Sequence, residues 1–237
     1  QVWRENFEDA QEYNQRRAAY AKGETRDYSL PKSDLEALLP VLKGSVPLVV
    51  RVNRSSDIEA LLRFASDFPQ LRLILAGAAE AWMHAPALAE AKIPVILDAL
   101  GDGPSGFDRL HGRAENAALL HQAGVPIILS TFSALDGREL TQYAGNAVRS
   151  GLPYAAALAA LTSTPAQAFG LENYGVLRVG AQASMVAWQG DPLELRTQVN
   201  GLWIDGNPQD LTTRQTELLD RYRTLPGRPL EIDLVPE

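Results

Sequence analysis

Four short apolar segments alternate with helical segments through the middle of the chain. The apolar segments are 46–53 (VPLVVRVN), 71–77 (LRLILAG), 93–100 (IPVILDAL) and 125–130 (VPIILS). Each is nearly continuous in apolar residues, as is typical of a strand buried on both faces. Helical patterns follow them at 55–68, 80–92, 113–124 and 137–151. This alternation predicts an α/β fold with a parallel sheet, either doubly wound or part of a (β/α)8 barrel.

Helical patterns also flank this repeat. One covers residues 1–20, and another begins at a cap formed by Ser33 or Asp34 and ends near residue 42. We expect a serine cap for the helix at 55–68 as well. After the repeat, residues 153–171 indicate two helical pieces broken at Pro165.

The C-terminal part of the chain changes character. Residues 183–188 and 198–205 are predicted to be short strands separated by turns, and a last helix covers 209–225. The tail is rich in proline, and we expect it to be extended or partly disordered. The chain begins without methionine, inside a helical pattern, so we expect that residue 1 is not the natural start.

Composition excludes several classes of function. The formal net charge is −7 and the basic residues are scattered, which argues against a nucleic-acid partner. No apolar run approaches the roughly 20 residues that span a bilayer. The absence of cysteine excludes disulfides, thiolate metal sites and cysteine nucleophiles. Lys22, Lys32, Lys43 and Lys92 are the only lysines. None follows a predicted strand, which argues against a Schiff base.

Polar side chains collect where the four predicted strands end. The carboxyl ends of parallel strands are where α/β proteins usually carry their sites. The residues at these ends are Arg51, Asn53 and Arg54, then Glu80 and Trp82, then Asp98 and Asp102, and finally Ser130, Thr131, Ser133 and Asp136. We therefore expect them to lie together around one opening, at the carboxyl end of the sheet.

Two interpretations of these residues are open. Glu80 or Asp98 is the candidate general base, and Arg51 can bind a carboxylate through two parallel hydrogen bonds. The other candidate substrate contacts are Asn53, Arg54, Trp82, Thr131 and Ser133. Alternatively, Arg51 pairs with Glu80 or Asp98 and has only a structural role. The histidines, His84, His111 and His121, lie in predicted helices or a loop, which argues against metal ligation.

Three linked motifs resemble the C-terminal half of the amidohydrolase superfamily, near its imidazolonepropionase-like and prolidase-like branch. They are LTSTPAQAFGL, GVLRVGAQASMVAWQGDP and VNGLWIDGN. The resemblance implies strands five to eight of a (β/α)8 TIM-like barrel at 1–181 and strands of a small β-sandwich at 182–207. A helix and tail at 208–237 complete the chain. It also implies that the partner is a missing N-terminal half of the same barrel.

Members of this family typically use zinc, but this sequence departs from their ligand pattern. The resemblance places the strand-five histidine on Arg51, the strand-six histidine on Gly77 or Ala78, and the strand-eight aspartate on Phe132. Arginine stays protonated and phenylalanine has no ligand atom. We therefore expect no metal or other cofactor in this half.

Two functions follow as expectations. One is a hydrolase that acts on the C–N bond of an amide, cyclic amide or dipeptide at an atypical site. The other is an inactive barrel that binds a small molecule or partners an active homologue, in a homo- or hetero-oligomer. The sequence leaves the compartment open, and relatives of this branch favour a soluble protein of the bacterial periplasm.

Overall fold

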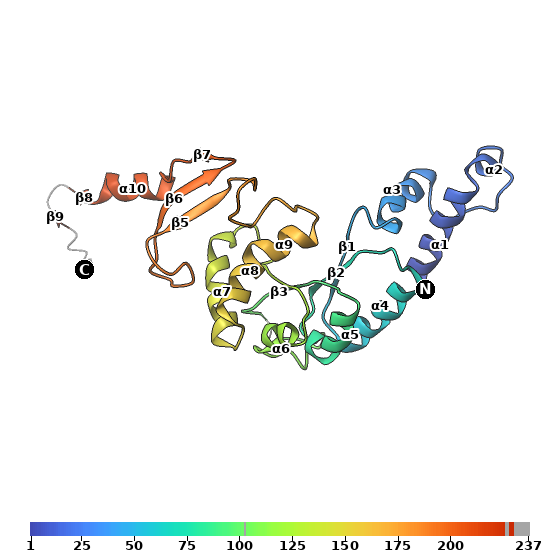
Figure 1. Ribbon diagram of the computed structural model, residues 1–237, viewed down its shortest axis with the longest axis horizontal. Helices are drawn as coiled ribbons and strands as arrows, with labels where there is room; N and C mark the ends of the chain where they lie inside the picture. Colours follow the sequence, from blue (N-terminus) through green and yellow to red (C-terminus); the bar gives the residue numbers. More distant parts are fainter. Residues whose placement is uncertain (102, 226–227, 230–237) are drawn as a thin grey trace. The chain divides into compact units, whose positions relative to one another are not determined.

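The computed structural model describes residues 1–101, 103–225 and 228–229 (Figure 1). Their contacts divide the chain into two units. The first comprises Gln1–Ala181 with Leu193–Leu195, and the second comprises Gln182–Pro192 with the residues from Arg196 onward. Position 102 and most of the predicted C-terminal tail, at 226–227 and 230–237, lie outside the described residues.

The first unit contains a four-stranded parallel sheet. Its strands are β1 (Leu48–Val52), β2 (Leu73–Gly77), β3 (Val95–Leu97) and β4 (Ile127–Leu129). Their order in the sheet is their order in the chain, and every neighbouring pair is parallel. A doubly wound sheet reverses its strand order, so that alternative is wrong. A sheet wound in one direction is typical of part of a TIM-like barrel.

Strand register places two rows of side chains on opposite faces of this sheet. Val50, Leu75, Val95 and Ile127 form one row and are buried in the hydrophobic core. The next row along the strands is Arg51, Ala76, Ile96 and Ile128. Because successive residues of a strand point to opposite faces, this second row lies on the face away from the core helices. In this second row, Arg51 is the one charged residue and the other three residues are apolar.

Helices follow each strand as the periodicity predicts. They are α4 (Ser55–Asp67) after β1, η1 (Ala81–His84) and α5 (Ala85–Glu90) after β2, α6 (Asn116–Gln122) after β3, and η2 (Gly137–Glu139) and α7 (Leu140–Arg149) after β4. Pro86 lies in the first turn of α5, where a missing N–H costs nothing. The predicted helix at 80–92 is two pieces, which meet between His84 and Ala85.

Three local predictions are wrong. The break in 153–171 lies at Thr162, between α8 (Tyr154–Leu161) and α9 (Ser163–Ala168), while Pro165 sits in the first turn of α9. The helix α3 (Lys32–Leu42) begins after Pro31, so Ser33 and Asp34 are helical rather than capping. The serine cap predicted for α4 is also absent, because Ser55 is its first helical residue.

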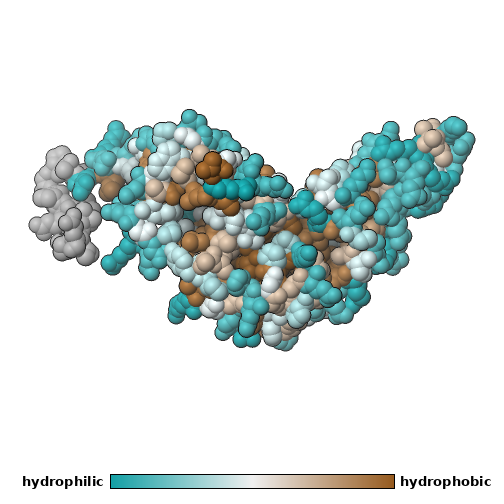
Figure 2. All heavy atoms as spheres, viewed as in Figure 1, coloured by the Kyte–Doolittle hydropathy of each residue, from teal (hydrophilic) through white to brown (hydrophobic). Residues whose placement is uncertain are grey.

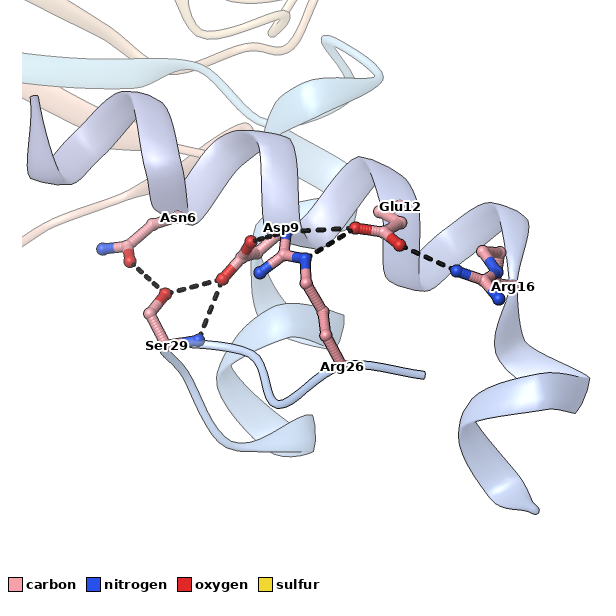
Figure 3. Close-up of polar contacts among 6 residues, drawn as sticks. All are labelled: Asn6, Asp9, Glu12, Arg16, Arg26 and Ser29. Atoms are coloured by element: carbon pink, nitrogen blue, oxygen red, sulfur yellow. Dashed lines mark hydrogen bonds and ion pairs between the residues drawn. The ribbon is translucent and has the colours of Figure 1, made fainter. Parts of the chain in front are cut away.

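The chain begins with the helices α1 (Val2–Gln15) and α2 (Arg17–Ala21), and a buried carboxylate on α1 binds the segment that follows α2 (Figure 3). Asp9 accepts hydrogen bonds from the Ser29 N–H at 2.9 Å and from Arg26 at 2.5 Å. Arg26 also pairs with Glu12 at 3.0 Å. Burial raises the pKa of Asp9, but the bonds from Ser29 and Arg26 outweigh burial and lower it. The network therefore holds the 22–31 segment against α1.

The second unit contains a three-stranded antiparallel sheet. Its strands are β5 (Met185–Trp188), β6 (Val199–Ile204) and β7 (Asn207–Pro208), in that order. The predicted strands at 183–188 and 198–205 are confirmed in shortened form. The helix α10 (Arg214–Tyr222) begins with a capping box in which Thr213 and Thr216 bond each other's backbone N–H. A short pair, β8 (Thr224–Leu225) and β9 (Arg228–Pro229), follows.

No helix among the described residues is long and apolar enough to cross a membrane.

We expect Asp9→Asn to lower the free energy of unfolding by about 1–3 kcal/mol at pH 7, because the variant loses a charge-assisted network. An acid with a lowered pKa stabilises the fold above its unfolded pKa, about 3.9, and loses this effect as pH falls through the folded value. The difference from wild type in urea unfolding should therefore shrink in acid. Asp27→Asn is the control, because Asp27 is exposed. Equal effects of the two substitutions would contradict the assignment.

Candidate functional site

A cation and an aromatic ring face each other at the strand ends. The guanidinium of Arg51, on β1, lies over the ring of Phe132, with its Cζ 5.4 Å from the ring centroid. Phe132 follows β4, at the opposite edge of the sheet. The contact therefore joins side chains that come from the two edges of the sheet. It also replaces the predicted pairing of Arg51 with Glu80 or Asp98, because Arg51 forms no ion pair with any described residue.

A tight turn aims the Phe132 ring. Its φ of +52° is in the left-handed region, which is unfavourable for a bulky side chain. The Phe132 N–H donates to the Ser130 hydroxyl at 3.1 Å. The Thr131 hydroxyl donates to the Ser133 carbonyl at 2.8 Å. Thr131 and Ser133, two predicted substrate contacts, thus bond within the turn, and their role in binding stays a prediction.

Residues after β1 hold a segment of the loop that follows β3. We call residues 106–113 the strand-end loop. Asn53 donates from Nδ2 to Asp108 at 2.5 Å, and Arg54 donates from Nε to the Phe107 carbonyl at 3.2 Å. The hydrogen bond from Asn53 lowers the pKa of Asp108. Two predicted contacts, Asn53 and Arg54, therefore position this loop.

Glu80 joins three segments of the chain. It is 5% exposed, and its carboxylate accepts the Ser55 N–H at 2.8 Å and the His111 N–H at 2.9 Å. The His111 ring lies 3.3 Å away. Burial raises the pKa of Glu80, but the hydrogen bonds from His111 and Ser55 outweigh burial and lower it. Glu80 thus stands in for the missing serine cap of α4 and also anchors the strand-end loop.

Trp82 is fixed by the same loop. Its Nε1 donates to the His111 carbonyl at 2.9 Å, and the Arg113 guanidinium lies over its ring at 5.0 Å. The backbone N–H of Trp82 donates to the side-chain oxygen of Asn116, a fully buried residue. The ring is therefore half-covered by the chain itself.

Asp98 lies directly after β3. Its Oδ1 accepts the N–H groups of Leu100 at 3.0 Å and of Gly101 at 2.8 Å. Its other oxygen lies close to Gly101, so a side chain at position 101 would displace the Asp98 carboxylate. Asp102, the other carboxylate predicted here, lies outside the described residues.

Sequence reasoning missed a hydroxyl–imidazole pair beside these residues. Ser55 Oγ and His84 Nε2 are 2.7 Å apart, linking the start of α4 to η1. Such a pair is able to pass a proton between its members. The sequence contains one indication that His84 lies near Glu80, because a spacing of four residues places both on one helical face.

The positions that the resemblance assigns to metal ligands do not fit zinc. Arg51 is a permanent cation, and Phe132 offers a ring. Gly77 has φ +83°, and the Asn53 amide oxygen lies 2.6 Å from where its Cβ would be. Ala78 is buried and has no donor atom. Within the ranges that the structure describes, no group of three His, Asp or Glu residues is able to hold a metal ion.

Comparisons with known proteins point to one family. Residues 67–213 match the family model described as the amidohydrolase family. "Amidohydrolase tasK" of Hapsidospora irregularis is 28% identical over an alignment of 198 residues, which covers 77% of this chain and 19% of that protein.

Two solved structures share the fold. An amidohydrolase from Thermotoga maritima MSB8 has a TM-score of 0.76 and 28% identity, over 90% of this chain and 55% of that one. A molinate hydrolase has a TM-score of 0.56 and 19% identity, over 78% of this chain and 47% of that one. The chain thus spans about half or less of the length of these relatives.

We expect Glu80→Gln to lower the free energy of unfolding at pH 7 and to loosen the strand-end loop, because the amide accepts the same N–H groups without the charge. Since the pKa of Glu80 is lowered, its stabilisation is present above the ordinary value of about 4.3 and is lost as pH falls through the folded value. Urea unfolding measures the first effect, and tryptic cleavage after Arg109 or Arg113 the second.

Glu90→Gln is the matched control, because Glu90 is exposed and forms no ion pair or side-chain hydrogen bond within the described ranges. Cleavage of the Glu80 variant no faster than of this control would contradict the anchoring role.

Proposed function

Because this chain belongs to the amidohydrolase family, we propose that it is part of a hydrolase that cleaves the C–N bond of an amide, cyclic amide or dipeptide. The observation that carries this proposal is its similarity to the Thermotoga maritima amidohydrolase, at 28% identity over 90% of the chain. The polar residues at the carboxyl ends of its four parallel strands support it further, since TIM-like barrels carry their chemistry there.

Asp98 is the better of the two candidate bases. Both oxygens of Glu80 accept backbone N–H groups, whereas both bonds to Asp98 go to one oxygen. The other oxygen of Asp98 is then available to take a proton from a water that attacks the carbonyl carbon. In this proposal Glu80 acts as a positioning residue. No step passes through zinc, because the ligand positions in this chain do not fit it.

The proposed substrate contacts surround the same mouth. Arg51 supplies the charge that orients a polar substrate. The other contacts are Asn53, Arg54, Trp82, Thr131 and Ser133. Since several of these also hold the strand-end loop or the Phe132 turn, they contribute through the loops that they position as well as by direct contact.

The missing half of the barrel is the proposed partner. β1 is an edge strand of the described sheet, and its Val49 is 44% exposed. A cavity of about 680 Å³ opens beside this edge, lined by apolar residues such as Trp3 and Phe64 and by charged ones, among them Arg51, Asp57 and Asp108. Figure 2 shows apolar side chains at the surface of this unit among the polar ones. An unpaired, partly apolar edge favours a further parallel strand, from the same polypeptide or from another subunit.

A second candidate function is a barrel that binds a small molecule, or partners an active homologue, without hydrolysis. The replacement of three ligand positions by Arg51, Gly77 and Phe132 favours it, because the usual chemistry of the family needs those ligands. The two functions share the site and differ in turnover.

We expect the protein to hydrolyse members of a panel of N-acyl amino acids, cyclic amides and dipeptides. We also expect Arg51→Ala to reduce kcat/KM by about tenfold or more, because the variant loses charge-assisted contacts to the substrate. Arg138→Ala is the control, because Arg138 is exposed. Metal analysis of the same sample reports any bound zinc. Binding without turnover on the whole panel would overturn the hydrolase and support the second function.

A further inference from the structure

We propose that Arg51, held against the Phe132 ring, binds the carboxylate group of a small ligand. The inference rests on the proposed function in placing the ligand at the strand ends, and it adds the chemical class of that ligand. A binding measurement tests this inference, and its result does not depend on whether the protein hydrolyses a substrate.

Arg51 has no acidic partner among the residues that the structure describes. Its side chain is exposed and forms no ion pair or hydrogen bond with the described residues. The carboxylates that follow neighbouring strands have other partners. Glu80 is bonded to Ser55 and His111, and Asp98 is bonded to its own turn. In a chain with a formal net charge of −7, a cation that pairs with none of the described carboxylates is a feature that needs an explanation.

The surroundings of Arg51 strengthen the attraction for an anion. Its neighbours in the same row of the sheet are apolar, and Ala76 and Ile128 are each 5% exposed. A charge beside low-dielectric material interacts more strongly with an ion of opposite sign than it does in bulk water. Arg51 also lines the cavity beside β1 together with Asp57 and Asp108. Asp108 is bonded to Asn53, and neither carboxylate pairs with Arg51.

The ring of Phe132 fixes the geometry of the guanidinium. A cation over a ring face, 5.4 Å from its centroid, is held in place while the N–H groups at the edge of the guanidinium stay available. This fork of N–H groups matches the two coplanar oxygens of a carboxylate. Pre-organisation lowers the entropy lost on binding.

The strained turn supports a functional reading of the pair. A bulky residue at φ +52° is strained relative to a relaxed backbone. The Ser130 and Thr131 hydroxyls stabilise the turn, so the local structure is built around this conformation. Glycine would adopt it without strain. What phenylalanine adds at this position is the ring beneath Arg51.

Nuclear magnetic resonance of the arginine Nε–Hε groups in the full chain tests the proposal directly. The probes are N-acetylglycine, its neutral analogue N-acetylglycinamide, and inorganic phosphate. We expect N-acetylglycine to shift one Arg signal saturably and the neutral amide to leave it unchanged. We expect phosphate to bind more weakly, because its tetrahedral oxygens fit the fork less well. Loss of that signal in Arg51→Lys assigns it to Arg51.

Variants then separate the two members of the pair. We expect Arg51→Lys to weaken N-acetylglycine binding by about tenfold, since lysine keeps the charge but loses the fork, and Arg51→Met to abolish it. Phe132→Leu should weaken binding by a smaller factor, since it removes the ring and keeps an apolar side chain. Arg138→Lys is the control. Circular dichroism confirms that each variant is folded.

Three results would overturn the proposal. They are unchanged affinity in folded Arg51→Met, an equal response to the neutral amide, and tighter binding of phosphate than of N-acetylglycine. Carboxylate binding without turnover would overturn the proposed hydrolase and leave this inference standing.

Discussion

Burial of one face of four parallel strands against helices is the constraint from which the site follows. The row of Val50, Leu75, Val95 and Ile127 enters the core, and this fixes the register of every strand. A slip by one residue would turn these side chains to the other face, at a large cost in buried apolar area. Because register is fixed, the next residue of β1, Arg51, is placed on the face away from the core.

Polar contacts then hold the loops at the carboxyl ends of the strands. Glu80 is central, since one buried carboxylate satisfies N–H groups from the start of α4 and from the strand-end loop. A buried carboxylate with these partners is stable as an anion, whereas a lone one would cost several kcal/mol. Asn53, Arg54 and Trp82 add further bonds to the same loop. The mouth is therefore bordered by a loop with many anchors.

Two of the positions that the resemblance assigns to metal ligands, Arg51 and Phe132, are here joined in a different way. Arg51 and Phe132 come from opposite edges of the described sheet and meet through a cation–π contact. A bridging metal and a cation–π pair both hold two strand ends together. In the cation–π pair, the positive charge of Arg51 is not neutralised, so it is able to attract an anion. This is why carboxylate recognition and hydrolysis are separate proposals for the same mouth.

The sequence alone determined the strand and helix order, the parallel sheet and the family, because these depend on apolar periodicity and on motifs local in the chain. It also determined that Arg51, Gly77 and Phe132 lack metal-ligand atoms. Only the tertiary structure decided the partners of each polar residue. The pairing predicted for Arg51 was replaced by Phe132, Glu80 took the place of a serine cap, and Ser55 met His84. These contacts join residues far apart in the chain, and side-chain direction at a loop depends on backbone angles that no local pattern encodes.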